Sequence, residues 1–313
     1  MYGQFFLLFA VVFTGYFLRL ANFIDSNMNK GLNKFIVYFA YPCLLVKCIG
    51  TLDLSTSLML QFIEATVIVV VMFFLFALVM RFYAKTTSKD DSIRNVFELA
   101  SISPNNGFMG FPVALAFFGS RGLFFMVAHN VAMSLFVFTY GLLRLRGEKA
   151  ENASAVKLLK TIGKVFLNPN VFSVGIGFLI CIYDISLDNN IGEYLTMIGN
   201  VATPMAMVFI GSTLAENRLF DIVKIKIVWE SAGIKLFALP IISMLLVYAA
   251  PLNIILKQII VLAFALPTGT VIPMLAEQEG QNRLLGSQIM FITTVLSMGT
   301  LPIFVFIINS III

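Results

Sequence analysis

Long apolar runs separated by short polar breaks dominate the chain. A membrane-spanning helix needs about 17–25 apolar residues, because the hydrocarbon core is about 30 Å thick and a helix rises about 1.5 Å per residue. Runs of that length occur ten times in the 313 residues. They cover residues 4–20, 32–49, 60–81, 94–118, 122–143, 168–185, 193–212, 225–248, 256–276 and 285–309. The pattern predicts an all-α integral membrane protein with ten transmembrane helices.

The composition excludes a water-soluble fold. Hydrophobic residues make up 59% of the chain and charged residues 12%, against about 45–50% and 25% in soluble globular domains. The three cysteines lie in apolar runs, and no Cys/His cluster has the spacing of metal ligands. We therefore expect no structural metal and no cofactor. The first run has no basic segment before it and no small-residue cleavage site after it, so we expect a permanent helix and not a removable signal peptide.

The positive charges are distributed unevenly. Seventeen of the 21 Lys and Arg residues follow odd-numbered spans, and short loops rich in these residues stay in the cytoplasm. This asymmetry predicts a multi-pass protein of the plasma membrane with both termini on the outer side. It also explains the net charge of +5 without a nucleic-acid partner. The most charged loop, 146–166, would be a cytoplasmic linker between two halves, 1–145 and 167–313, and its basic face could contact anionic lipid.

The two halves are similar at an offset of about 162–163 residues. The matched positions are Gly15 with Gly177, Pro42 with Pro204, and Pro104 with Pro267. Each half has five spans, and because five is odd, the second half must be inverted relative to the first. The spacing therefore predicts ten helices arranged as 5+5 inverted repeats.

Spans four and nine contain polar interruptions near their middle. Pro104 is followed by Asn105-Asn106-Gly107, and Pro267 by Thr268-Gly269-Thr270. Proline removes a backbone donor and clashes with the preceding turn, while the residues after it favour turns and helix caps. Each span is predicted to break there. A break inside the bilayer survives only where protein or a water-filled cavity surrounds it, so two equivalent breaks indicate a binding site; a simple proline kink is the alternative.

The run from Asn105 to Pro112 and the Pro267–Thr270 break resemble the auxin efflux carrier family, which includes plant auxin exporters and bacterial malate and malonate permeases. The resemblance covers the whole chain. It implies a fold similar to bile acid/sodium symporters, in which the broken helices 4 and 9 cross at the substrate site. It further implies that helices 1, 2, 6 and 7 form a scaffold against which helices 3–5 and 8–10 move as an elevator. Plant members carry a long central hydrophilic loop, and the short linker here is similar to the bacterial branch.

The interrupted spans also suggest what could bind. A half-helix that starts inside the membrane presents free N–H groups and a partial positive charge, which suit a carboxylate. The expected substrate-binding residues are Pro104, Asn105, Asn106, Gly107, Asn130, Pro267, Thr268, Gly269 and Thr270. Gly107 and Gly269 would let a ligand approach the backbone, whereas the asparagines could instead serve only as helix caps.

Ionisable or strongly polar residues inside membrane spans are costly and need a reason. The coupling candidates are Glu98, His129, Lys235 and Gln288. Lys235 could balance a carboxylate substrate or replace a coupling cation, or it could form an ion pair with Glu98 or Glu230. His129 could meet the crossing helices or be a satisfied core histidine. Gln288 aligns with Phe125 of the first half, so the site is not symmetric.

These observations favour a secondary carrier of small organic anions, such as malate and other mono- or dicarboxylates. No P-loop motif is present, so the chain is not expected to hydrolyse ATP. The chain has a single histidine and no hydrolase motif around it, so the protein is not expected to be an enzyme. A channel and a non-transporting receptor remain alternatives. The expected partners are the organic anion and the lipid bilayer, with a co-transported proton and a homodimer as further candidates.

Overall fold

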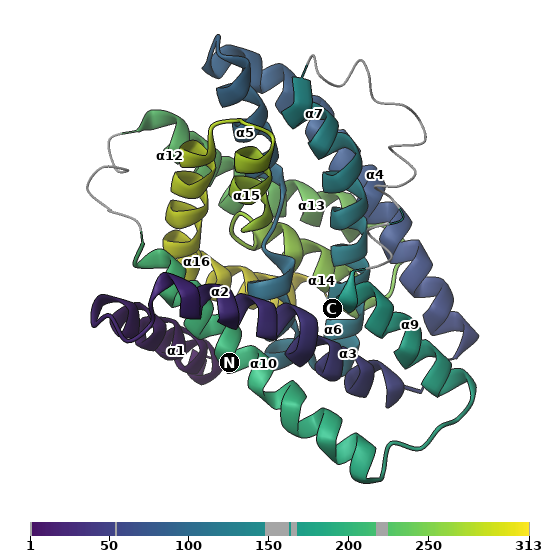
Figure 1. Cartoon of the computed structure of the whole chain (residues 1–313). Helices are drawn as coiled ribbons and strands as arrows, with labels where there is room; N and C mark the ends of the chain where they lie inside the picture. Colours follow the sequence, from purple (N-terminus) through teal and green to yellow (C-terminus); the bar gives the residue numbers. More distant parts are fainter. Residues whose placement is uncertain (1, 54, 148–162, 164–167, 217–224, 313) are drawn as a thin grey trace. The chain divides into compact units, whose positions relative to one another are not determined.

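The computed structural model of the chain describes residues 2–53, 55–147, 163, 168–216 and 225–312. The regular structure within these ranges is helical, with one isolated pairing of extended backbone (Figure 1). The helices are α1 (Tyr2–Leu20), α2 (Ser26–Phe35), η1 (Ile36–Ala40), α3 (Tyr41–Gly50), α4 (Thr56–Thr87), α5 (Asp91–Ile102), η2 (Asn106–Gly110), α6 (Phe111–Phe136), η3 (Val137–Gly141), α7 (Leu142–Arg146), α9 (Pro169–Ile182), α10 (Asn190–Leu214), α12 (Lys226–Gly233), η5 (Ile234–Ala238), α13 (Leu239–Tyr248), α14 (Ile254–Ala265), α15 (Val271–Gln278) and α16 (Arg283–Ile311), where η marks a π-helical turn.

Seven helical stretches in the described residues are long and apolar enough to cross a membrane. Two shorter apolar helices, α9 and α14, accompany them. Each of the ten predicted spans consists mainly of helical residues. The helical stretch Asn106–Arg146 contains the end of span four and all of span five. These two spans are separated at Gly119, which has a positive φ of 63°. The all-α membrane class is thus confirmed, whereas the organisation into ten spans and two inverted repeats stays a prediction.

The chain divides into two compact units. Unit 1 comprises Met1–Ile63, Gly107–Val127 and Phe166–Asn217, and unit 2 comprises Glu64–Asn106, Ala128–Val165 and Arg218–Ile313. Helices α4 and α6 each contain a boundary between the units.

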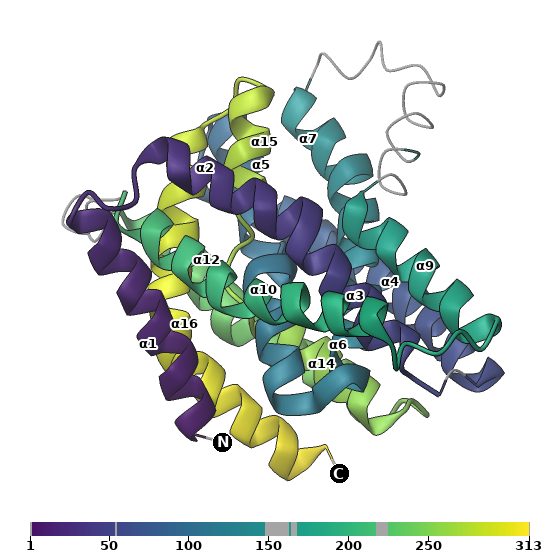
Figure 2. The same cartoon turned by 60° about the horizontal axis from the view of Figure 1, so that its bottom comes forward.

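Unit 1 is built on close approaches between helices (Figure 2). A Cβ atom added at Gly211 of α10 would lie 1.9 Å from the Val12 carbonyl oxygen of α1, and one at Gly15 would lie 2.2 Å from the Val208 carbonyl oxygen. Helix α3 contacts α9 in a similar way, since a Cβ at Gly177 would lie 2.8 Å from Ile49. Small residues allow helix backbones to approach closely in membranes, so these glycines determine how closely α1 packs on α10 and α9 on α3.

Unit 2 has an aromatic core. The ring of Phe73 in α4 lies 5.1 Å from that of Phe136 and 5.2 Å from that of Phe264 in α14, measured between centroids. Helices α5, α12, α14 and α15 all contact α16 within this unit. Phe264 of this core belongs to α14, which is one of the two interrupted helices described next.

Candidate functional site

Helices α5 and α14 each end two residues before a proline, at the predicted interruptions. The residue after α5 is Ser103 (φ −87°, ψ 114°) and the residue after α14 is Leu266 (φ −65°, ψ 152°). Both have the extended conformation that a following proline imposes. Pro104 and Pro267 therefore stop the two helices at equivalent points, and both spans are interrupted and not merely kinked.

The two interruptions pair with each other inside unit 2. The Asn105 amide donates to the Pro267 carbonyl oxygen at 2.8 Å, and the Gly269 amide donates to the Ser103 carbonyl oxygen at 3.0 Å. Pro104 and Thr268 thus form an antiparallel bridge, called the crossover below. A Cβ at Gly269 would lie 2.8 Å from the Pro104 carbonyl oxygen. Gly269 therefore allows the backbone of the other interruption, at Pro104, to approach closely.

Thr268 satisfies a carbonyl that Pro104 leaves without a donor. In a regular helix the Ala100 carbonyl would accept from residue 104, but proline has no N–H. The Thr268 hydroxyl, fully buried, donates to that oxygen at 2.7 Å. The Thr268 amide in turn donates to the Thr293 hydroxyl at 3.1 Å. One threonine thereby connects the end of α5 to the break in the other helix and to α16.

Lys235 has the corresponding role at the end of α14. Its ammonium group donates to the Phe264 carbonyl oxygen at 3.0 Å, and its side chain has no solvent exposure. A cation at a helix C-terminus interacts favourably with the helix dipole. Lys235 lies in the π-helical turn η5, and such turns are frequent at functional sites.

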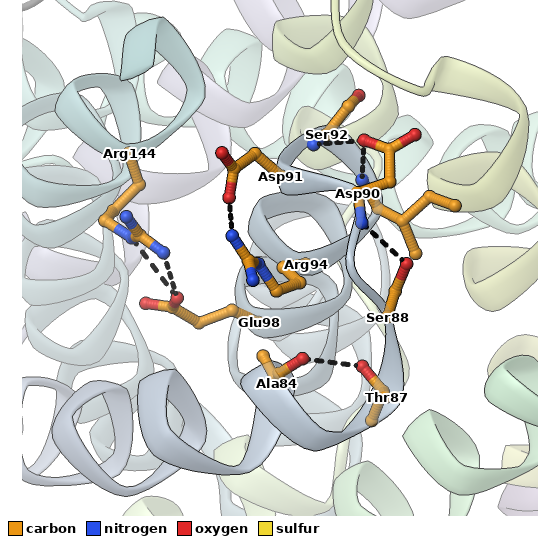
Figure 3. A network of polar contacts seen from close by, with 10 residues as sticks. Ala84, Thr87, Ser88, Asp90, Asp91, Ser92, Arg94, Glu98 and Arg144 are labelled. Atoms are coloured by element: carbon orange, nitrogen blue, oxygen red, sulfur yellow. Dashed lines mark hydrogen bonds and ion pairs between the residues drawn. The ribbon is translucent and has the colours of Figure 1, made fainter. Parts of the chain in front are cut away.

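The predicted ion pair of Lys235 with Glu98 or Glu230 is wrong. Glu230 pairs with Lys226 at 3.3 Å, four residues earlier on the same helix. Glu98 accepts from Arg144 Nη2 at 3.0 Å and Nε at 3.2 Å, as Figure 3 shows, and from the Tyr140 hydroxyl. A guanidinium presents two donors to a carboxylate and matches its geometry better than an ammonium does. Glu98 is fully buried, and no described carboxylate lies within ion-pair distance of Lys235.

Asn106 and His129 form a buried pair beside the crossover. Asn106 Nδ2 lies 2.9 Å from His129 Nδ1, and the two side chains are 0% and 1% exposed. With Asn106 Nδ2 as the donor, Nδ1 is the acceptor, which assigns the ring proton to Nε2. Asn106 Oδ1 and His129 Nε2 have no hydrogen-bond partner among the described residues. The pair therefore presents one free acceptor and one free donor, and His129 is not a fully satisfied core residue.

The other predicted site residues have different surroundings. Asn105, Asn130, Thr270 and Gln288 make no side-chain hydrogen bond within the described parts of the chain, and all except Thr270 are buried. Gly107 lies in the turn η2 with open space where a Cβ would project. Thr270 precedes α15 but its side chain does not cap that helix.

Several polar residues at this site were missed at the level of sequence. Tyr140 and Arg144 are four residues apart, on one face of a helix that continues to Arg146, and this spacing could have identified them as partners for Glu98. Ser103 is fully buried and its hydroxyl has no partner among the residues described. Thr293 belongs to a pair of threonines in an apolar helix, which is a weaker signal.

A family model described as membrane transport protein matches residues 1–305. The chain belongs to this family. It is the auxin efflux carrier family, which the motifs at Asn105–Pro112 and Pro267–Thr270 resemble. The identification made from those motifs is confirmed, and the crossover is a feature of a membrane transport protein.

Two relatives of the chain are named as transporters, and a third is named as a signaling protein. The chain is 24% identical over 293 residues to an uncharacterized transporter of Methanothermobacter thermautotrophicus, covering 93% of each chain. It is 24% identical over 217 residues to an uncharacterized transporter of Methanocaldococcus jannaschii, covering 67% of each chain. It is also 28% identical over 238 residues to the mouse lysosomal cholesterol signaling protein, covering 73% of this chain and 26% of the mouse protein.

Proposed function

We propose that this member of the family is a secondary active transporter that carries small organic anions, mono- or dicarboxylates such as malate, across the plasma membrane. The observation that supports this most strongly is the crossover, in which Asn105 and Gly269 bond to the opposite break. Carriers commonly build substrate sites from discontinuous membrane helices.

The crossover suits an anion. Two half-helices begin just after it, at Asn106 and at Val271. N–H groups at the start of a helix carry partial positive charge and can hold a carboxylate where no backbone acceptor binds them. The Ile272 amide is not one of these, because it donates to the Gly269 carbonyl oxygen at 3.2 Å. The Asn105 side chain, 5% exposed and without a partner in the described residues, supplies a further amide donor. We propose Asn105, Asn106, Asn130 and Thr270 as substrate contacts, with Thr268 and Gly269 holding the crossover in shape.

Lys235 supplies a charge that the substrate can balance. A buried ammonium without a carboxylate partner is unfavourable, and among the described residues Lys235 donates one hydrogen bond, to the neutral Phe264 carbonyl. A bound anion near the crossover would compensate this charge. Binding of the anion would then favour the protonated form of Lys235, so we propose a proton and not sodium as the coupling ion. Glu98 is excluded from that coupling pair because it is bonded to Arg144 and Tyr140.

An elevator mechanism is compatible with the two units. Both strands of the crossover lie in unit 2 with α5, α14 and α16, whereas α1, α3, α9 and α10 lie in unit 1. This division supports a scaffold that contains helices 1, 2, 6 and 7 and a transport domain that contains α5 and helices 8–10. Residues 107–127, which include the second half of helix 4 and the start of helix 5, belong to unit 1, so the units match the proposed elevator domains only in part.

Inverted repeats are supported by matching boundaries. Helices α5 and α14 each have 12 residues, and both their starts (91 and 254) and their ends (102 and 265) are 163 positions apart. An Asp or Asn side chain caps each helix, at Asp90 and Asn253. We propose repeats at 1–145 and 167–313; the linker 146–166 lies almost entirely outside the described residues.

Binding of a carboxylate panel to the purified protein tests this function. We expect at least one mono- or dicarboxylate to raise the unfolding temperature of the wild type, with an effect that depends on pH and not on sodium. Asn105→Ala should weaken that binding, since losing one or two ligand hydrogen bonds costs about 1–3 kcal/mol. Stabilisation only by cations or neutral solutes would contradict an anion carrier.

Two alternatives make different predictions in reconstituted vesicles. A channel would give steady conductance above the turnover of a carrier. A receptor, which the signaling function in the name of the mouse relative favours, would bind its ligand without accumulating it.

A further inference from the structure

An apolar groove of about 240 Å³ lies on unit 1, between the η1–α3 segment, the start of α9, and α10. Tyr38, Pro42 and Val46 form one wall, and Phe172 and Ile176 form the other. Tyr38 and Phe172 are 67% and 63% exposed, so their rings flank an open entrance. The polar side chain Ser173 is 3% exposed and donates its hydroxyl proton to the Pro169 carbonyl at 2.6 Å. The groove therefore suits an apolar occupant.

Two lysines precede the groove on the helical segment that forms its first wall. Lys34 is four residues and Lys30 eight residues before Tyr38, and residues four positions apart are neighbours on a helix surface. Both lysines are exposed, and neither has an ion-pair partner among the residues that the structure describes. Helix α9 begins at Pro169 in the groove wall, and its N-terminus adds partial positive charge there.

The dimensions match part of a lipid chain. The eight residue steps from Tyr38 to Val46 span about 12 Å along the helix, which is most of one leaflet of a hydrocarbon core about 30 Å thick. A phosphate near Lys34 would therefore leave its acyl chain alongside Pro42 and Val46.

We propose that this groove is a binding site for one anionic phospholipid, with an acyl chain between α3 and α9 and its phosphate on Lys34 and Lys30. The apolar walls would accept any acyl chain, but two unpaired lysines favour a headgroup with net negative charge. The site is separate from the crossover and independent of which solute is carried.

Native mass spectrometry of the full chain in detergent tests the site, with phosphatidylglycerol and phosphatidylcholine of identical acyl chains as probes. We expect one phosphatidylglycerol to bind at concentrations where phosphatidylcholine does not. Lys30→Gln with Lys34→Gln should weaken phosphatidylglycerol binding about fivefold per lysine, from about 1 kcal/mol for each basic residue. The matched control is Lys85→Gln with Lys89→Gln, two exposed lysines also four residues apart, which should leave binding unchanged.

Ile176→Trp should fill the groove and remove the bound lipid, whereas Val67→Trp, at a residue of α4 that is 56% exposed, should not. Circular dichroism checks that each variant folds, and if the tryptophan variant does not, the lysine pair decides the question. Four results would each overturn the proposal. They are equal binding of both lipids, preferential binding of a sterol, a second copy of the chain bound in place of lipid, and equal weakening of binding by the control lysine pair.

Discussion

The hydroxyl of Thr268 offers the sharpest test of how the crossover is held together. Replacing Thr268 with valine preserves the shape of the side chain but removes the donor to the Ala100 carbonyl, a bond of 2.7 Å. Pro104 cannot supply the missing hydrogen bond because it has no N–H. The Thr268→Val protein therefore has a buried carbonyl without a donor.

The expected cost follows from that missing donor. Leaving a buried acceptor unsatisfied costs about 1–3 kcal/mol, which corresponds to about a 5–150-fold change in an equilibrium constant. Thr294→Val is the matched control. The Thr294 hydroxyl, also buried, donates to Met290 one turn earlier in the continuous helix α16 at 2.7 Å. That carbonyl keeps its helical N–H donor, so the control should change stability by less than about 1 kcal/mol.

The assay is unfolding of each purified variant in the same detergent, together with solute uptake after reconstitution. We expect Thr268→Val to have the lower unfolding temperature and the lower uptake, and Thr294→Val to resemble the wild type. Equal effects of the two substitutions, or wild-type behaviour of Thr268→Val, would refute the assignment of this hydroxyl as the cap of α5.

Three further substitutions examine other parts of the structure. Glu98→Gln should destabilise the protein by about 2–4 kcal/mol, because Arg144 loses its buried carboxylate partner but remains partly exposed to solvent. A double-mutant cycle with Arg144→Gln should show a coupling energy above about 0.5 kcal/mol. Additive effects of the two substitutions would exclude a stabilising ion pair. Gly211→Ala should cost about 1–3 kcal/mol in thermal unfolding, since its Cβ would lie 1.9 Å from the Val12 carbonyl oxygen, whereas Gly175→Ala, with no atom within 4 Å of the new Cβ, should not destabilise. Lys235→Met should weaken carboxylate binding at least tenfold and abolish the response of uptake to an imposed proton gradient; an unchanged response would remove Lys235 from coupling.

The positions of the helices and of both interruptions could be predicted from sequence because local chemistry determines them. Apolar run length sets the spans, and Pro104 and Pro267 end α5 and α14 through their own sterics. The crossing of the two interrupted helices was expected from the family resemblance, whereas the hydrogen bond between Asn105 and Pro267 was not predicted. No local pattern specifies contacts between residues that are more than 160 positions apart.

The partners of the charged residues were harder to predict. Lys235 and Glu98 have opposite charges within membrane spans, and charge alone suggested an ion pair. The structure instead has Lys235 at the orphaned carbonyl of Phe264 and Glu98 at Arg144. The predicted fifth span ends at residue 143, just before Arg144, but the helix extends to Arg146, which brings the Arg144 guanidinium within reach of Glu98. Orphaned backbone groups compete with carboxylates for buried cations, and only the three-dimensional arrangement determines which of them binds.

Accumulation of radiolabelled malate and related carboxylates in proteoliposomes tests the central claim most directly. Asn105→Ala is the site variant. Its control is Asn27→Ala, because Asn27 is an exposed asparagine in the first turn of α2. The account predicts saturable accumulation of at least one carboxylate by the wild type and by Asn27→Ala, driven by a proton gradient and reduced about fivefold or more by Asn105→Ala. Accumulation that Asn105→Ala leaves unchanged, or the absence of accumulation for every carboxylate that the protein binds, would contradict an anion carrier that uses the crossover as its site.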